Sequence, residues 1–387
     1  MKLSSFIIFL SVVLGIYFSA SIYIFFHGLH SLSEMRFLKI FYIIAFIAVT
    51  LSYIVARFLL GYGNYSWFSY FFLTVGSFWM AALVYFFLIS LSADLIRLIN
   101  HFIPFYPPFI TEHYGKFKFF TFIISIIGVS SLLGYGYFNA QKPVVNEIEL
   151  RFEKQIPGSE EINMVMLSDI HLGPLSCGKW FDSIVAKVNS LEPDIIILAG
   201  DVIDEDLAPV ISMNLGDHLL NLKCKYGVYA ITGNHEYIGG AERAVKYLSE
   251  HNITVLRDTS VFVDNKFYLI GREDRDKKRF TGTDRKQLDE LMKDVKTEFP
   301  VIVLNHQPFN LEELEGKNID LSLSGHTHHG QFFPVNLVTN LIYEVSRGYL
   351  NKYGTHIYVS QGVGTWGPPV RIGNKPEIVY LRIRGIN

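Results

Sequence analysis

The sequence predicts a fold in two parts: an N-terminal all-α transmembrane bundle over residues 1–140 and a C-terminal α/β domain over residues 145–387. The first part is crowded with Phe, Ile, Leu, Tyr and Val, and it helps to raise the apolar share of the 387-residue chain to 50%. The second part has charges spread throughout, and short apolar runs in it alternate with clusters of polar residues. Membrane-length stretches followed by strand-like runs predict an anchored α/β protein.

Four apolar stretches in the first part have the length of membrane-spanning helices. A helix needs about 20 predominantly apolar residues to cross the hydrocarbon core of a bilayer. The stretches run roughly over residues 6–26, 37–60, 67–91 and 119–138. The first stretch is longer than the apolar region of a signal peptide, which has about 7–15 residues, so we expect an uncleaved anchor. We therefore predict a multi-pass integral membrane protein with about four transmembrane helices, whose partner is the lipid bilayer.

The charged residues of this part lie near the ends of the stretches. Arg57 is inside the second stretch, close enough to its end for the guanidinium to reach the membrane surface. We see no ionisable group at the middle of a stretch, which favours anchoring over transport. Basic residues are more frequent in the loops after the first and third stretches, and this places those loops in the cytoplasm. The C-terminal domain is then expected on the extracytoplasmic side.

The net charge gives no sign of nucleic-acid binding, and the cysteines give no sign of a thiol-based metal or redox site. The net charge is −2, so nothing in the bulk electrostatics indicates nucleic-acid binding, and we expect no nucleic acid as a partner. The two cysteines, Cys177 and Cys224, have neither metal-ligand nor redox-motif spacing. A disulfide between them is left open.

Five short apolar runs in the second part each end in a cluster of polar residues. Nearly continuous runs of this length, rich in β-branched residues and bounded by turn residues, are typical of strands buried on both faces. Between the first two runs, apolar residues recur at helical spacing from Ser176, a suitable N-cap, to Leu191. This order of strand, helix and strand predicts a layered α/β domain. The runs cover residues 162–167, 195–198, 228–231, 301–304 and 319–323.

The polar clusters after these runs contain the residue types that bind divalent metal ions. Ligands of open α/β sheets bind at the carboxyl ends of the strands, so we expect the five clusters to meet there. Imidazole, carboxylate and amide oxygen together suit Mn, Fe, Zn or Ni. The clusters are Asp169-Ile170-His171, Gly200-Asp201-Val202-Ile203-Asp204, Gly233-Asn234-His235-Glu236, the single His306, and Gly325-His326-Thr327-His328.

Each cluster has a simpler interpretation when it is taken alone. Asp-x-His and Gly-Asp-x-x-Asp sequences are common in turns and helix caps, and a lone histidine after a strand is more often hydrogen-bonded in the core or at its rim. The Gly-His-Thr-His sequence is more specific for metal. The ordered set, repeated at successive strand ends, is what predicts two metal ions. Two ions about 3.5–4 Å apart activate a water and hold the attacking and leaving oxygens of a displacement at phosphorus.

The ordered set resembles the pattern of the calcineurin-like metallophosphoesterase superfamily over about residues 160–384, and no ligand position of that pattern is missing. The likeness is greatest to the bacterial membrane-associated branch, through residues 328–331 and the tail at 362–371. His329 departs from the pattern, since many relatives have glycine there. The resemblance implies a two-sheet αββα sandwich for the C-terminal domain and a location in the bacterial inner or plasma membrane.

The family's functional residues can be carried over position by position. The resemblance implies that one metal ion is held by Asp169, His171, Asp201 and His328, and the other by Asp201, Asn234, His306 and His326. Asp201 would bridge both ions. His235 would stabilise the phosphoryl charge or protonate the leaving oxygen, and Asp204 would orient His235. Arg371 has two open interpretations, a contact with substrate phosphate and a structural ion pair.

The resemblance implies a metal-dependent phosphoric ester hydrolase. A phosphodiester or pyrophosphate is the expected substrate class, with an envelope glycolipid or phospholipid as a candidate because the anchor concentrates such substrates. Two alternatives stay open at this point. One is an anchored phosphomonoesterase or protein phosphatase, and the other is a transport or signalling protein with a regulatory phosphoesterase domain.

Overall fold

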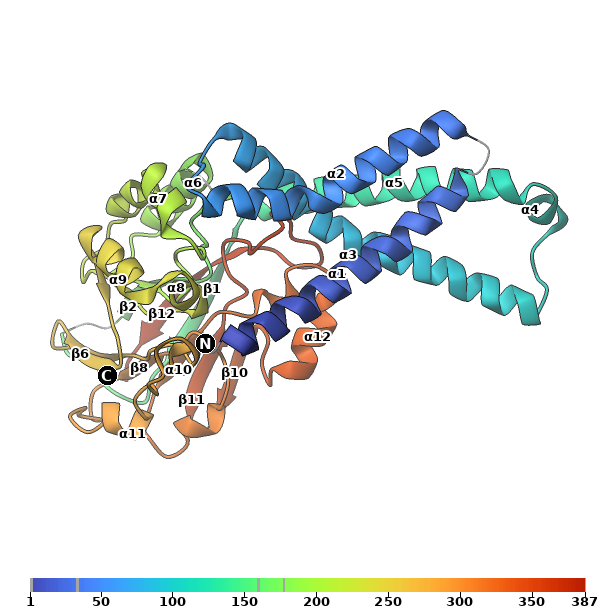
Figure 1. Ribbon diagram of the computed structural model, residues 1–387. Helices are drawn as coiled ribbons and strands as arrows, with labels where there is room; N and C mark the ends of the chain where they lie inside the picture. Colours follow the sequence, from blue (N-terminus) through green and yellow to red (C-terminus); the bar gives the residue numbers. More distant parts are fainter. Residues whose placement is uncertain (1–2, 33–34, 159–160, 177, 387) are drawn as a thin grey trace. The chain divides into compact units, whose positions relative to one another are not determined.

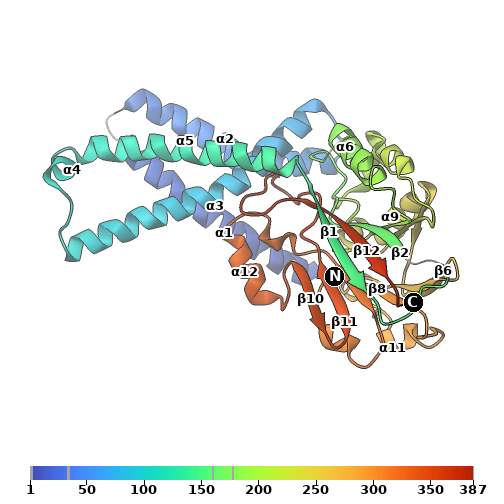
Figure 2. The same cartoon turned by 180° about the vertical axis from the view of Figure 1, so that it is seen from behind.

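The computed structural model describes residues 3–32, 35–158, 161–176 and 178–386, and Cys177 lies outside this part of the chain. The chain divides into two compact units, Met1–Tyr137 and Phe138–Asn387 (Figures 1 and 2). The first unit is helical and the second contains all twelve strands of the described residues. The predicted combination of an apolar helical bundle and an α/β domain is confirmed.

The first unit is built from α1 (Leu3–Ser31), α2 (Arg36–Gly61), α3 (Trp67–Phe102), the short α4 (Pro108–Glu112) and α5 (Tyr114–Ala140), of which the last three residues belong to the second unit. Four of them, all except α4, are long and apolar enough to cross a membrane. Helices α2 and α3 approach each other closely at Gly76, where a Cβ atom would lie 2.4 Å from the backbone nitrogen of Tyr53. Small residues at such contacts let backbones pack tightly in lipid, where burial of apolar surface gives no driving force.

Helix α3 extends past the predicted end of the third span at Leu91 and includes Asp94 and Arg97. The sequence analysis gave only the apolar stretch, with charged residues near its end. Inside the helix, however, Asp94 is well supplied with partners, because the Tyr23 hydroxyl donates to its Oδ2 at 2.5 Å and Nε2 of His27 lies 3.0 Å away. Arg97 pairs with the other carboxylate oxygen from the next turn. A paired carboxylate does not interrupt a helix, so the charge marked the end of the apolar stretch only.

The second unit contains two six-stranded sheets. The first sheet has the order β1-β12-β2-β3-β4-β5, and the second has the order β10-β11-β9-β8-β7-β6. Strands β2, β3, β4 and β5 are parallel, as are β7, β8, β9 and β11, while β10 and β6 run antiparallel at the two edges of the second sheet. The strands of the first sheet are β1 (Val144–Arg151), β2 (Glu161–Leu167), β3 (Ile195–Leu198), β4 (Val228–Ala230), β5 (Ile253–Val255) and β12 (Glu377–Arg384). Those of the second are β6 (Thr259–Val263), β7 (Phe267–Gly271), β8 (Val301–Leu304), β9 (Leu321–Ser324), β10 (Gly348–Lys352) and β11 (Thr355–Val359).

Three layers of apolar side chains hold these sheets together. The middle layer lies between the sheets, where Met164 and Ile197 of the first sheet share one core with Leu269 and Leu321 of the second. The outer layers lie under the helices. The one on the first sheet includes Phe181 of α6. The central strands are therefore buried on both faces, which explains why they read as continuous apolar runs rather than alternating ones.

Several helices of this unit cover the outer faces of the two sheets. Helix α6 (Gly178–Asn189) confirms the helix predicted between the first two runs, and it packs on the first sheet with α7 and α9. The covering of the second sheet includes α11 and the 3₁₀-helix η2. All helices of the second unit, whether or not they cover a sheet, are α6, α7 (Leu207–Ser212), η1 (Leu215–Asn221), α8 (Asn234–Gly239), α9 (Ala241–Glu250), α10 (Lys277–Thr281), α11 (Leu288–Leu291), η2 (Leu311–Leu314), η3 (His328–Gly330) and α12 (Val335–Ile342). This is the αββα sandwich that the resemblance implied.

Candidate metal centre

The predicted site residues come together because their strands end at one edge of the sandwich. Asp169 follows β2, Asp201 follows β3, and Asn234 is the first residue of α8 after β4. From the second sheet, His306 follows β8, and His326 follows β9. Parallel strands present their carboxyl ends on the same side, so both sheets supply side chains to one site.

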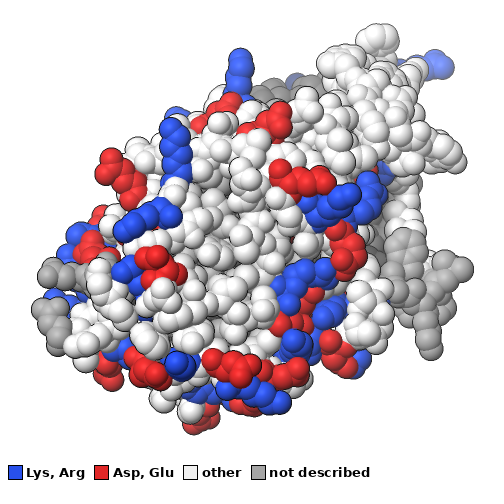
Figure 3. Space-filling view, turned by 90° about the vertical axis from the view of Figure 1, so that its left-hand side faces the viewer, with Lys and Arg blue, Asp and Glu red and all other residues white. Residues whose placement is uncertain are grey.

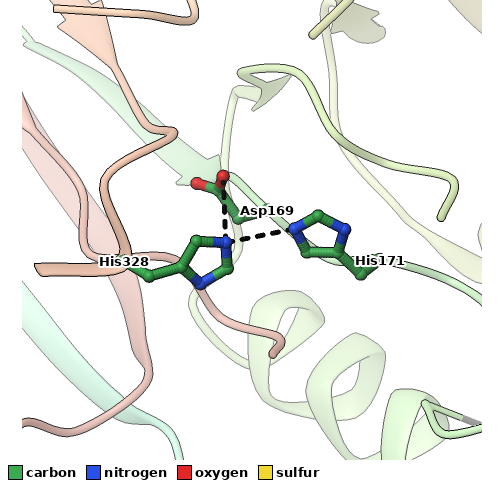
Figure 4. Close-up of side chains that lie close together, drawn as sticks. All are labelled: Asp169, His171 and His328. Atoms are coloured by element: carbon green, nitrogen blue, oxygen red, sulfur yellow. Dashed lines mark hydrogen bonds and ion pairs between the residues drawn. The ribbon is translucent and has the colours of Figure 1, made fainter. Parts of the chain in front are cut away.

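The first group of candidate ligands is Asp169, His171 and His328 (Figure 4). Nε2 of His328 lies 3.1 Å from Nε2 of His171 and 3.5 Å from Oδ1 of Asp169. All three side chains are buried, coming from the turn after β2 and from η3. Two imidazole nitrogens that face each other and a carboxylate oxygen form a donor set suited to a divalent cation.

The second group is Asp201, His306 and His326, with Asn234 beside it. Oδ2 of Asp201 lies 3.1 Å from Nε2 of His306, and Oδ1 of Asn234 lies 2.8 Å from Nδ1 of His326. Nδ1 of His306 is 2.8 Å from the carbonyl oxygen of Ala199. As a hydrogen-bond donor to that carbonyl, Nδ1 leaves the Nε2 lone pair free for a metal ion, the usual arrangement of a ligating histidine.

Asp201 lies between the two groups. Its Oδ2 atom is 3.9 Å from Nε2 of His171 in the first group as well as 3.1 Å from Nε2 of His306 in the second. Its Oδ1 atom accepts a hydrogen bond of 2.9 Å from the backbone N–H of His235, which fixes the carboxylate. This is the position that the resemblance requires for a bridging ligand.

The backbone at the site is strained in a way that serves this convergence. Asp169, His171, Asp201 and His326 all have positive φ, between 50° and 72°, a region that side chains other than glycine adopt at a cost. Gly233 has no room for a side chain, because a Cβ atom would lie 2.1 Å from Oδ1 of Asp201. The tight turns bring ligands from neighbouring strands closer than straight strands could.

Glu236 holds two of these turns together. Its carboxylate accepts hydrogen bonds from the backbone N–H groups of Asp201 at 3.1 Å, Ile203 at 2.9 Å and Gly233 at 2.7 Å. The sequence analysis placed Glu236 in a motif but gave it no role. The signal for it was the acidic residue two positions after Asn234, at the start of a helix, where a side chain can reach back to backbone N–H groups.

The Asp201 carboxylate and the imidazoles around it stabilise each other's charges. Burial raises the pKa of Asp201, but the imidazoles of His306 and His235 outweigh burial and hold that pKa well below its usual value. Burial lowers the pKa of His306, but the Asp201 carboxylate outweighs burial and raises it well above its usual value. A buried carboxylate therefore depends on nearby positive charge, which a divalent cation supplies more fully than a proton.

Two other histidines of the site are held neutral. Burial, together with the charge on His306, lowers the pKa of His326 to about 3. Burial, together with His171 and the Arg371 guanidinium, lowers the pKa of His328 well below its usual value. A histidine must be neutral to bind a metal ion, so both side chains are ready to do so at neutral pH.

His235 and Asp204 lie beside the two ligand groups and form, with His171, a third candidate ligand group. Nδ1 of His235 lies 3.2 Å from Oδ1 of Asp204, and the His235 ring stands edge-on to the His171 ring at 4.5 Å. Burial lowers the pKa of His235, but Asp201 and Asp204 outweigh it and raise that pKa to about 9. The imidazole therefore carries a proton at neutral pH, held in orientation by the carboxylate.

The contacts of Arg371 favour a structural role over a contact with substrate phosphate. The side chain is fully buried, and its guanidinium donates to the carbonyl oxygens of Gly362 at 3.1 Å and Gly364 at 2.6 Å. It also lies 3.2 Å from Nδ1 of His328. The guanidinium supports the loop behind a candidate ligand. His329, the departure from the family pattern, is buried with Nδ1 2.8 Å from the Ser346 hydroxyl and belongs to neither ligand group.

The donor set fits a metal centre. Among the described residues, the buried Nε2 atom of His306 has no hydrogen-bond partner and faces the Asp201 carboxylate. Imidazole nitrogens, carboxylate oxygens and one amide oxygen are all present. This set suits Mn, Fe, Zn or Ni, as the sequence predicts.

Comparison with known proteins agrees with this geometry. Residues 162–330 match the calcineurin-like phosphoesterase family. A metallophosphoesterase of Helicobacter pylori (strain ATCC 700392 / 26695) is 35% identical over 65% of this chain and 68% of its own length. A metallophosphoesterase of Aquifex aeolicus (strain VF5) is 32% identical over 68% of this chain and 98% of its own length.

Relatives also occur outside bacteria. A transmembrane protein with a metallophosphoesterase domain from Bos taurus is 32% identical over 67% of this chain and 60% of its own length. The family likeness therefore extends beyond the bacterial branch in which the sequence analysis placed it. Four apolar helices and a relative named as a transmembrane protein agree that this is a membrane protein. The chain belongs to the calcineurin-like metallophosphoesterases.

Proposed function

We propose that the protein is a membrane-anchored hydrolase that cleaves a phosphodiester or pyrophosphate bond at a centre of two divalent metal ions. The observation that carries the proposal is the pair of ligand groups on either side of Asp201. Two bound cations would supply an activated hydroxide and neutralise the phosphoryl charge. We propose Asp169, His171 and His328 as ligands of one ion, Asn234, His306 and His326 as ligands of the other, and Asp201 as the bridge.

The remaining polar residues suit the other half of the reaction. Asp201 and Asp204 raise the pKa of His235 in the metal-free protein, which favours a charged imidazole that can stabilise the phosphoryl oxygens or donate its proton to the leaving oxygen. Oδ1 of Asp204 lies 3.2 Å from Nδ1 of His235, close enough to orient a charged imidazole, so we propose Asp204 as a positioning residue. Glu236 keeps the Asp201 and Asn234 turns in register.

The anchor favours a substrate in or near the bilayer, and a lipid or other amphiphile with a phosphate ester is the proposed class. We propose an extracytoplasmic location for the catalytic unit, with the bacterial inner or plasma membrane as the site of the anchor, on the distribution of basic residues in the loops. An anchored phosphomonoesterase is the second candidate, because the same ligand set can hold a monoester.

Activity on two soluble substrates distinguishes these candidates. We expect the purified, Mn-loaded protein to cleave bis-p-nitrophenyl phosphate, because two divalent cations would supply the hydroxide and neutralise the charge of the diester. The rate of p-nitrophenol release is compared with that from p-nitrophenyl phosphate under the same conditions. Cleavage of the monoester alone would reject the diesterase proposal and favour the second candidate.

A further inference from the structure

An apolar patch surrounds helix α12 on the surface of the second unit. Leu337 and Leu341 lie one turn apart on the helix, as do Val338 and Ile342, so these side chains share one side. Leu341 is 87% exposed, and none of the residues of α12 is buried. The α12 patch consists of Phe333, Leu337, Val338, Leu341, Ile342 and Trp366, each more than half exposed.

The α12 patch is formed by chain segments without exposed charge. Residues 331–343 contain no charged side chain, and residues 361–374 contain only the fully buried Arg371. Other parts of the molecule differ: on the face in Figure 3, lysine, arginine, aspartate and glutamate are interspersed. A contiguous set of exposed large apolar side chains marks a surface that is covered by something in the working protein.

The patch is tied to the end of a membrane-spanning helix. Asn139, the last residue but one of α5, donates from Nδ2 to the carbonyl oxygens of Arg371 at 2.9 Å and Asn374 at 2.7 Å. The same loop is also bonded to the segment before α12, because the backbone N–H of Phe333 donates to the carbonyl oxygen of Ile372 at 2.8 Å. All of these residues belong to the second unit. The patch is thus attached, through this loop, to the last residues of α5.

The same loop is fixed to the patch at a second position. Gln331 donates from Nε2 to the carbonyl oxygens of Trp366 at 3.0 Å and Pro368 at 2.7 Å, and its Oε1 accepts from the Trp366 N–H at 2.8 Å. These bonds join Gln331, four residues before the start of α12, to the loop that carries Trp366. The patch is therefore one preformed surface rather than two independent segments.

The patch also borders the candidate metal centre. Trp366 stands edge-on to the His235 ring at 5.9 Å, and Tyr343, which follows α12, stands edge-on to the His326 ring at 6.1 Å. The turn with His328 packs directly on the start of α12, since a Cβ atom at Gly330 would lie 2.4 Å from the backbone nitrogen of Asn336. A partner that covers the patch therefore lies next to the candidate metal centre.

We propose that the α12 patch inserts into the lipid leaflet from which α5 emerges, and that it holds the metal centre at the level of the lipid headgroups. A bilayer is the occupant that this surface fits, because the bonds of Asn139 attach the patch to a helix that already crosses one. The exposed Lys142 and Lys375 flank this attachment and suit anionic headgroups. Resting on the proposed function, the substrate is then an amphiphile whose phosphate ester is cleaved while its chains stay in the membrane.

Depth measurement on the full chain tests the insertion without any need for activity. In a background with Cys177→Ser and Cys224→Ser, an environment-sensitive fluorophore is attached at Leu341→Cys, and the protein is placed in nanodiscs of phosphatidylcholine and phosphatidylglycerol. Lipids with a nitroxide on the acyl chain are expected to quench this label strongly. The matched control is Asn265→Cys, at the exposed turn between β6 and β7, and its label should stay unquenched.

Two results would overturn the insertion. Quenching at position 341 no stronger than at position 265 would mean that lipid does not reach the patch. A label at 341 that is shielded from water but unquenched by lipid would mean that protein covers it, either the membrane helices of this chain or a second copy. Retained Mn binding by each labelled variant shows that the fold has survived.

A rate comparison tests the substrate class. For the double variant Leu337→Asn and Leu341→Asn, we expect the cleavage of hexadecyl p-nitrophenyl phosphate in nanodiscs to fall by about tenfold or more, the scale of removing two leucines from an apolar phase. The rate on bis-p-nitrophenyl phosphate in solution should be unchanged. Equal losses on both substrates, or none on the lipid, would contradict the inference. If the wild-type protein cleaves neither substrate, the proposed function fails and the depth measurement still decides the insertion.

Discussion

Replacing His306 with alanine is expected to reduce the bound metal from two ions to one per chain and to lower diester hydrolysis by at least about 10²-fold, because a metal ion contributes several kcal/mol of transition-state stabilisation. His306 has the least ambiguous ligand geometry of the site, with Nδ1 near the Ala199 carbonyl and Nε2 facing Asp201. Its removal also takes away positive charge that Asp201 requires when no metal is bound. Mn content is measured by mass spectrometry on protein reloaded after chelation.

The matched control is His218→Ala. His218 lies in η1 and pairs with Asp182, and it belongs to none of the three candidate ligand groups found in the described residues. We expect this variant to keep the metal content and rate of the unmodified protein. If His306→Ala also kept both, the second metal position would be wrong, whereas loss of both ions would show that the two positions bind metal only together.

Replacing His235 with alanine is expected to slow turnover by roughly 10²–10⁴-fold while both metal ions stay bound, the usual scale for the loss of acid–base catalysis. His235 is not among the proposed ligands, and Nδ1 of its ring lies 3.2 Å from Oδ1 of Asp204, which is not a proposed ligand either. The backbone N–H of residue 235, which anchors Asp201, is unaffected by the substitution. Metal content and steady-state rates are measured on the same preparations.

The leaving group separates the two roles that His235 could have. An alkyl oxygen needs a proton to leave, whereas p-nitrophenolate is stable without one. If His235 is the acid, the loss in His235→Ala will be much larger for a dialkyl phosphodiester, whose leaving group is an alkoxide, than for bis-p-nitrophenyl phosphate. Equal losses would assign His235 to stabilisation of the phosphoryl oxygens. A variant with full activity on both, or one that loses metal, would contradict the assignment.

The parts of the fold that the sequence predicted well are those with a local signal. The runs ending before Ser168 and Ala199 are β2 and β3, and the spacing of Phe181 and Ile184 marked helix α6. Burial on both faces makes such strands continuously apolar, so they are visible without knowledge of their neighbours. The two-sheet arrangement was not visible in this way and came from the family resemblance, because pairing between distant strands leaves no mark in a single run.

The same distinction applies to the site. Asp169, His306 and His326 stood out because each follows an apolar strand, and the structure brings them within one site. Arg371 could not be assigned, since its partners are the backbone carbonyls of Gly362 and Gly364, and carbonyls have no sequence signature. The extent of α3 was missed for a related reason, because the partner that accommodates Asp94 is Tyr23, on another helix.

The α12 patch is also a feature that the sequence alone did not reveal. An apolar segment such as residues 335–342 has the composition of a core helix, and only the structure shows that its side chains are exposed. Its importance depends on the contacts of Asn139 and Gln331, which join segments far apart in the chain.

Anomalous diffraction from Mn-loaded crystals tests the central claim most directly, because it locates each ion relative to the side chains. The account predicts two peaks about 3.5–4 Å apart, one next to Asp169, His171 and His328 and the other next to Asn234, His306 and His326. The Asp201 carboxylate should lie between them. A single peak, or peaks away from these side chains, would contradict it.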